Sequence, residues 1–111
     1  MNRVLLTAAA RADIAAALRH SRQTFGPAAR ARYARLFQLA LSAIAEDSDR
    51  AGVREVADGL STYPLRSSGR DLPRPDRVAR PRHLIVFRRD GDRIAVVRVL
   101  DDRMDLPARL P

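Results

Sequence analysis

The chain has no cysteine and no lysine, and its aromatic residues are limited to two tyrosines and three phenylalanines. Without cysteine it cannot form a disulfide framework, a thiol nucleophile or a cysteine-based zinc site. Long apolar runs are also missing. No segment approaches the ~20 residues that a membrane-spanning helix needs, and Arg11 and Asp13 interrupt the apolar N-terminal stretch. We therefore expect a cytoplasmic protein without a secretory signal.

The charge of the chain is strongly positive. All 21 basic residues are arginine, and the formal net charge is +8. Complete absence of lysine, together with abundant alanine, arginine, aspartate and leucine, is typical of a GC-rich genome, so the choice of arginine says little about function. The sign of the charge is more informative, because it favours acidic partners.

The first half of the chain predicts two amphipathic helices. Residues 3–6 form a short apolar strand candidate, and Thr7 is suited to cap a helix from about Ala8 to Thr24. Gly26 ends that helix, and Pro27 fits the first position of a second helix that runs to about Glu46. Apolar residues recur at three- and four-residue spacing in both helices, which predicts an antiparallel hairpin with one shared apolar face.

The second half predicts a small antiparallel sheet. Apolar, β-branched runs at 84–87 and 94–97 flank Asp90-Gly91-Asp92, which is the pattern of a β-hairpin. The segment 60–66 is a further strand candidate, and Pro64 within it predicts an edge or bulged strand. At 111 residues the chain is one domain, 1–111. Its expected fold is α+β, with a short N-terminal strand, a two-helix hairpin and a small antiparallel sheet in the order β-α-α-β-β-β.

Neither a metal nor a cofactor is expected. No set of His, Asp and Glu has the spacing of metal ligands, and Asp90-Gly91-Asp92 reads as a hairpin turn rather than a calcium loop.

The most specific motif lies at the end of the last predicted strand. There Arg98-Val99-Leu100 is followed by a short polar step and by Met104-Asp105. Two less specific features accompany this motif: the triplet Ala12-Asp13-Ile14, and the Phe25-Gly26 break before a second helix that carries a tyrosine. With these motifs, nearly the whole chain resembles the RelE/ParE superfamily of toxins from type II toxin–antitoxin systems, specifically its ParE-like branch.

The resemblance implies one of two activities. RelE-like members cleave messenger RNA in the ribosomal A site, whereas ParE-like members inhibit DNA gyrase by trapping it on cleaved DNA. RNA cleavage by a 2′-hydroxyl needs a base, a stabiliser of the phosphorane charge and a proton donor. Arginine cannot practically act as the base, so few side chains remain for this chemistry. The candidates for a ribonuclease are Tyr63, Arg66, Arg70 and His83.

Position 101 departs from the family pattern. Many relatives carry histidine after the Arg-Val-Leu triplet, whereas this chain has Asp101, followed by Asp102 and Asp105. These carboxylates place negative charge where a nuclease would attract RNA phosphate, which disfavours RNA cleavage. The departure also leaves open an inactive toxin relative that only binds its antitoxin.

We therefore predict a toxin that is not an enzyme and that inhibits gyrase by binding. The expected contact surface is the exposed face of the sheet, with Arg88 and Arg98 pointing outward, together with the tail at about 103–111. The candidate target-binding residues are Arg88, Arg98, Arg103, Met104 and Leu106. The alternatives are a ribosome-dependent ribonuclease and a nucleic-acid-binding module. For the module, few aromatic residues are free to stack on bases, and sequence-specific binding is not expected.

The resemblance also implies a partner. Such toxins are neutralised by a co-encoded, ParD-like antitoxin whose disordered and often acidic C-terminal segment folds onto the toxin. The positive charge of this chain suits that segment. Its carboxylates would pair with arginines of the helical hairpin, and the candidates are Arg19, Arg22, Arg30 and Arg35.

Overall fold

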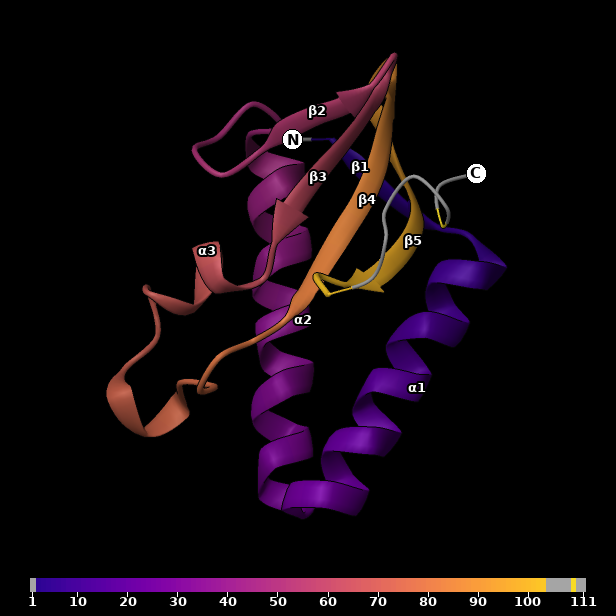
Figure 1. The fold of residues 1–111 in the computed structure, drawn as a ribbon. Helices are drawn as coiled ribbons and strands as arrows, with labels where there is room; N and C mark the ends of the chain where they lie inside the picture. Colours follow the sequence, from indigo (N-terminus) through magenta and orange to yellow (C-terminus); the bar gives the residue numbers. More distant parts are fainter. Residues whose placement is uncertain (1, 104–108, 110–111) are drawn as a thin grey trace.

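A computed structural model of the chain describes residues 2–103 and 109 (Figure 1). Two long helices pack on one face of a five-stranded sheet, which confirms the predicted α+β architecture. The elements in chain order are β1 (Arg3–Leu6), α1 (Ala8–Phe25), α2 (Pro27–Glu46), β2 (Arg54–Ala57), β3 (Leu60–Pro64), α3 (Arg66–Gly69), the 3-10 turn η1 (Arg74–Asp76), β4 (His83–Asp90) and β5 (Arg93–Asp101).

The helical hairpin forms for the local reasons that the sequence predicts. The Thr7 hydroxyl accepts a hydrogen bond from the backbone N–H of Ala10 at 3.1 Å and so caps α1. Gly26 separates the helices with φ +97, a conformation that favours glycine. Pro27 then starts α2. Helix α1 ends at Phe25, one residue later than predicted. No helix in the described part of the chain is long and apolar enough to cross a membrane.

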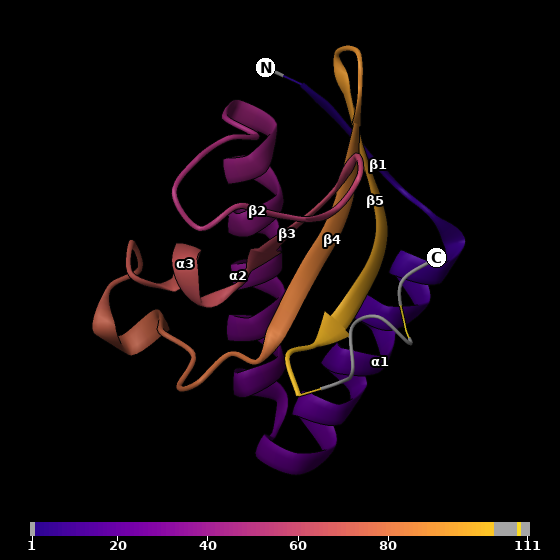
Figure 2. The same cartoon turned by 45° about the horizontal axis from the view of Figure 1, so that its top comes forward.

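The strands lie in the order β1-β5-β4-β3-β2, with β1 parallel to β5 and the other neighbours antiparallel. The helices cover one face of this sheet, as the two views show (Figure 2). Alternate strand residues face the helices and bury their side chains against them. The core between the two layers includes Leu36, Phe37, Ile44, Tyr63, Ile85, Phe87, Ile94 and Val96.

Strand β3 differs from the prediction of an edge strand. It lies between β4 and β2, a strand that the sequence did not predict because all four of its residues are exposed. Pro64 is tolerated because β2 pairs only with residues 60–62 of β3, so no strand lies beside Pro64 on that side. The strand also ends at Pro64 rather than at Arg66, which begins α3.

A cleft between the helical hairpin and the end of the sheet

A cavity of about 1080 Å³ opens between the helical hairpin, the loop before β4 and the end of β5. Tyr33, His83 and Val99 contribute to its lining, and Phe25, at 73% exposure, lies among its lining residues. Five arginines and two aspartates line the cleft, so its lining has a net positive charge. These charged lining residues are Arg32, Arg77, Arg80, Arg82 and Arg103, with Asp13 and Asp101.

Tyr33 and His83 are joined within the cleft. The Tyr33 hydroxyl lies 2.5 Å from Nδ1 of His83, and the His83 ring also lies against Phe37, with centroids 6.1 Å apart. Burial raises the pKa of Tyr33 to about 12. Burial also lowers the pKa of His83, although the negative charges of Asp101 and Asp102 act in the opposite direction on this imidazole. At neutral pH the phenol is therefore protonated and the imidazole uncharged. We assign the phenol as the donor to Nδ1, which places the imidazole proton on Nε2.

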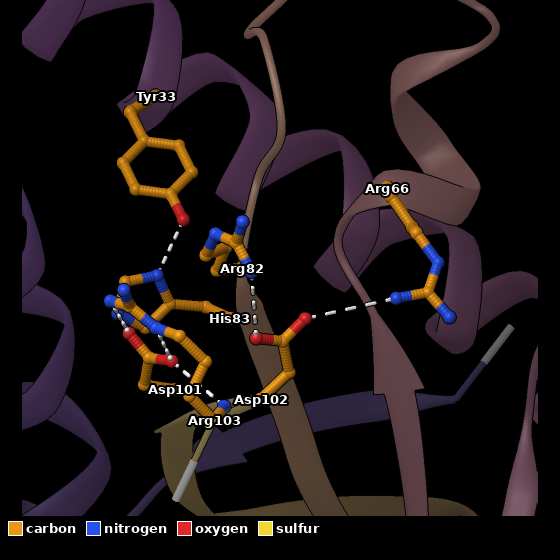
Figure 3. Close-up of polar contacts among 7 residues, drawn as sticks. All are labelled: Tyr33, Arg66, Arg82, His83, Asp101, Asp102 and Arg103. Atoms are coloured by element: carbon orange, nitrogen blue, oxygen red, sulfur yellow. Dashed lines mark hydrogen bonds and ion pairs between the residues drawn. The ribbon is translucent and has the colours of Figure 1, made fainter.

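Asp101 lies directly across from His83 in the β4–β5 ladder. Its carboxylate is held by Arg103, which donates from Nε at 3.0 Å, from Nη2 at 2.9 Å and from its backbone N–H at 2.9 Å. These contacts lower the pKa of Asp101 to about 2. Figure 3 shows Arg103 folded back onto Asp101 beside the His83 ring, so the carboxylate is ionised and already paired.

Asp102 faces away from this pair, toward two other arginines (Figure 3). Its carboxylate oxygens lie 3.8 Å from Arg66 Nη1 and 4.0 Å from Arg82 Nη1, and Oδ1 is buried with no hydrogen-bond partner among the described residues. The Asp102 backbone N–H donates to the Arg82 carbonyl at 2.6 Å. The side chain is thus placed between two cations without a directed hydrogen bond to either.

Arg98 does not point outward as an unpaired residue. Strand β1 pairs with β5 only as far as Val96, and Asp13 of α1 takes over the strand edge beyond it. The Asp13 carboxylate accepts hydrogen bonds from Arg98 Nε at 2.8 Å and Nη2 at 3.1 Å, and from the backbone N–H of Val99 at 2.9 Å. Arg98, predicted as an outward basic residue, is thus 32% exposed and paired with a carboxylate that α1 brings to it.

One comparison with known proteins identifies a family. Residues 4–106 match the family model described as ParE toxin of type II toxin-antitoxin system, parDE. The chain belongs to the ParE toxin family. Comparison with curated proteins gives no match. The chain is therefore a toxin component of a type II toxin–antitoxin system, and the family implies an antitoxin partner.

This ParE chain does not bring the ribonuclease candidates together. Tyr63 is fully buried, and its hydroxyl lies 2.8 Å from the Ser68 hydroxyl. It packs on the sheet as a core residue, so it cannot stack on a base or donate a proton to one. His83 lies in the cleft, whereas the exposed Arg66 and Arg70 line a separate, smaller pocket.

The other predicted residues keep distinct places in the ParE fold. Arg88 is exposed on β4 and Arg103 lies at the cleft, whereas Met104 and Leu106 lie outside the described residues. The four antitoxin candidates are all exposed, two on each helix: Arg19, Arg22, Arg30 and Arg35.

Two residues of the site were not predicted. The Tyr33 side chain packs in the core and is only 8% exposed, but its hydroxyl reaches the cleft. Asp13 is an acidic residue on a largely apolar stretch of α1, which was the available signal for its role. Among the residues that the structure describes, no group of three or more His, Asp or Glu could hold a metal ion.

Proposed function

We propose that this ParE-family toxin inhibits DNA gyrase by binding it, without chemistry of its own, and that a ParD-like antitoxin neutralises it. The observation that carries the proposal is that the acid–base groups near the sheet are already engaged. Tyr63 is buried, the His83 imidazole is bound to Tyr33, and Asp101 is bound to Arg103.

The state of His83 argues against a catalytic base. A base must offer an unprotonated nitrogen to the substrate. In the assigned tautomer Nδ1 accepts from Tyr33 and Nε2 carries a proton, so the neutral ring has no free lone pair. The nearest carboxylate, Asp101, has a pKa of about 2 and would accept a proton poorly at neutral pH.

The proposed contact with gyrase uses exposed basic residues. Arg88 lies on the second half of β4, where three consecutive residues are exposed, and the Arg103 side chain is 69% exposed although paired with Asp101. Strong ionic attraction would increase the rate of encounter with an acidic surface and set the orientation of the complex.

The proposed contact with the antitoxin uses the cleft. Its lining combines apolar side chains of both helices, such as Ala17 of α1 and Ala29 of α2, with a rim of arginines. An acidic amphipathic segment that folds on binding could bury its apolar side against the former and pair its carboxylates with the latter. Arg19, Arg22, Arg30 and Arg35 are available on the helical surfaces as further ionic partners.

A binding experiment with immobilised gyrase subunits tests the proposal. The protein should bind a gyrase subunit, Arg88→Glu should weaken binding at least about tenfold, and truncation before Arg103 should abolish it. Arg11→Glu is the matched control, since it makes the same charge reversal at an exposed position of α1. A folded protein that binds its antitoxin but no gyrase subunit would overturn the proposal. Ribosome-stimulated cuts within codons would instead identify a RelE-type ribonuclease.

A further inference from the structure

The segment from Arg66 to Arg82 carries a concentrated positive charge. It contains six arginines and two aspartates, so its net charge of +4 is half of the charge of the whole chain. All six arginines are exposed. The segment runs from α3 through η1 to the start of β4 and lies apart from the sheet, beside α2 (Figures 1 and 2). The arginines are Arg66, Arg70, Arg74, Arg77, Arg80 and Arg82.

Three of these arginines converge on a small pocket. A cavity of about 170 Å³ is lined by Arg66, Arg70 and Arg77, with Val78 and Pro81. Arg77 holds the loop in shape, because its Nε donates to the Leu72 carbonyl at 2.7 Å and its Nη2 to the Arg70 carbonyl at 3.2 Å. Within the described part of the chain, the other five arginines of the segment donate no side-chain hydrogen bond. Their guanidinium donors are thus available to a ligand.

The negatively charged carboxylate of Asp102 lies between Arg66 and Arg82. Its carboxylate lies 3.8 and 4.0 Å from the two guanidinium groups, too far for directed hydrogen bonds. The Arg66 and Arg82 side chains stay 61% and 45% exposed. A phosphate oxygen could approach each guanidinium more closely from solvent and bind in the bidentate geometry that arginine favours.

The backbone of the segment is held in a defined shape. Arg80 adopts φ +53, the only positive φ of a non-glycine residue in the described structure. Pro73, Pro75 and Pro81 restrict the chain on both sides of it. A loop that is already ordered loses less conformational freedom when a ligand binds.

We propose that this arginine segment, residues 66–82, binds the phosphate backbone of double-helical DNA. Arginines with free donors are suited to phosphates, and five of them in one segment provide an extended contact. The segment contains no aromatic residue and no histidine, so it lacks the stacking groups by which single-stranded RNA is recognised. The large exposed hydrophobic residues among those described, Leu5, Phe25 and Val56, all lie outside the segment. Arg66, Arg70 and Arg74 do not line the cleft proposed for the antitoxin, so these three arginines are left for a second partner.

The contact goes beyond the proposed binding of gyrase and does not require it. Gyrase presents DNA beside its own surface, so a toxin that binds both would gain from two linked contacts. Because the DNA contact resides in this chain alone, it is measured without gyrase, and its failure is distinguishable from failure of the proposed function.

Fluorescence anisotropy with a labelled DNA duplex of about two helical turns tests the inference. The full chain should bind two unrelated sequences equally, and the logarithm of the affinity should fall linearly with the logarithm of salt concentration. Arg66→Gln combined with Arg70→Gln should weaken binding about tenfold at low salt and reduce the slope by about 1.8, at about 0.9 for each lost phosphate contact. Arg11→Gln combined with Arg54→Gln removes the same charge from exposed positions outside the segment and should leave the slope unchanged.

Asp102→Asn provides a variant that should gain affinity, which unfolding cannot imitate. It removes the negative charge between Arg66 and Arg82 and keeps a side chain of the same size, so DNA should bind about threefold more tightly. Three results would overturn the inference: no binding of duplex DNA at low salt, equal losses in the two double variants, or tighter binding of single-stranded or double-stranded RNA than of DNA.

Discussion

Replacing Asp13 by alanine would remove the hydrogen bonds between the side chain at this position of α1 and the end of strand β5. The change removes three hydrogen bonds, two from Arg98 and one from the backbone N–H of Val99. Val99 is 3% exposed, so its N–H would be left without a partner, at a cost of about 1–3 kcal/mol. The Arg98 side chain is 32% exposed and can turn to water, so the loss of its ion pair adds only about 1 kcal/mol.

The free energy of unfolding should therefore fall by about 2–4 kcal/mol, which for a domain of this size lowers Tm by about 10–15 °C. Circular dichroism during heating and during urea titration measures both quantities. Asp13→Asn is the matched control: it keeps an oxygen that can accept from Val99 and should lose about half as much. In a double-mutant cycle, Arg98→Met should cost less when Asp13 is already alanine. A loss below about 0.5 kcal/mol for Asp13→Ala, or strictly additive effects, would refute this reasoning.

Two further predictions concern the cleft, and a third concerns the turn at Gly52. Tyr33→Phe removes the hydrogen bond to His83, so it should lower the free energy of unfolding by about 1 kcal/mol and raise the pKa of His83, as followed by NMR of the imidazole. Because folding lowers the pKa of His83, the unfolded chain binds more protons than the folded chain below about pH 6.5. The free energy of unfolding should therefore fall as the pH decreases through that range. Denaturant titrations at several pH values should show a weaker pH dependence of this free energy in His83→Gln. Gly52→Ala should destabilise the fold by about 2 kcal/mol in urea titrations, because Gly52 has φ +102 and a Cβ would lie 2.7 Å from Ser67 Oγ, whereas Gly91→Ala, at φ +62 with open space around it, should cost less.

The helical half of the fold was predictable because its signals are local. The cap at Thr7 and the Gly26-Pro27 junction act within a few residues, and they placed both helices to within one residue. The β-hairpin was predictable for the same reason, since two β-branched runs flank a short turn. Strand β2 gave no such signal, because its residues are all exposed and show no alternation of apolar and polar side chains.

The site depended on contacts between distant parts of the chain. Asp13 and Arg98 are 85 positions apart, and Tyr33 and His83 are 50 apart, so no spacing rule could have paired them. Tyr63 was a candidate only for the ribonuclease alternative, because Arg66 and Arg70 lie near it in sequence. Its place within β3 directs its side chain into the core.

The proposed action of this ParE-family toxin is to trap gyrase by binding, with no catalytic group of its own. Incubation of plasmid with purified gyrase, ATP and the toxin, followed by detergent and protease, is the assay for this action. We expect linear plasmid that appears only when both proteins are present and that is lost when the antitoxin is added. Unimpaired supercoiling with no linear plasmid, from a folded toxin that still binds its antitoxin, would contradict it.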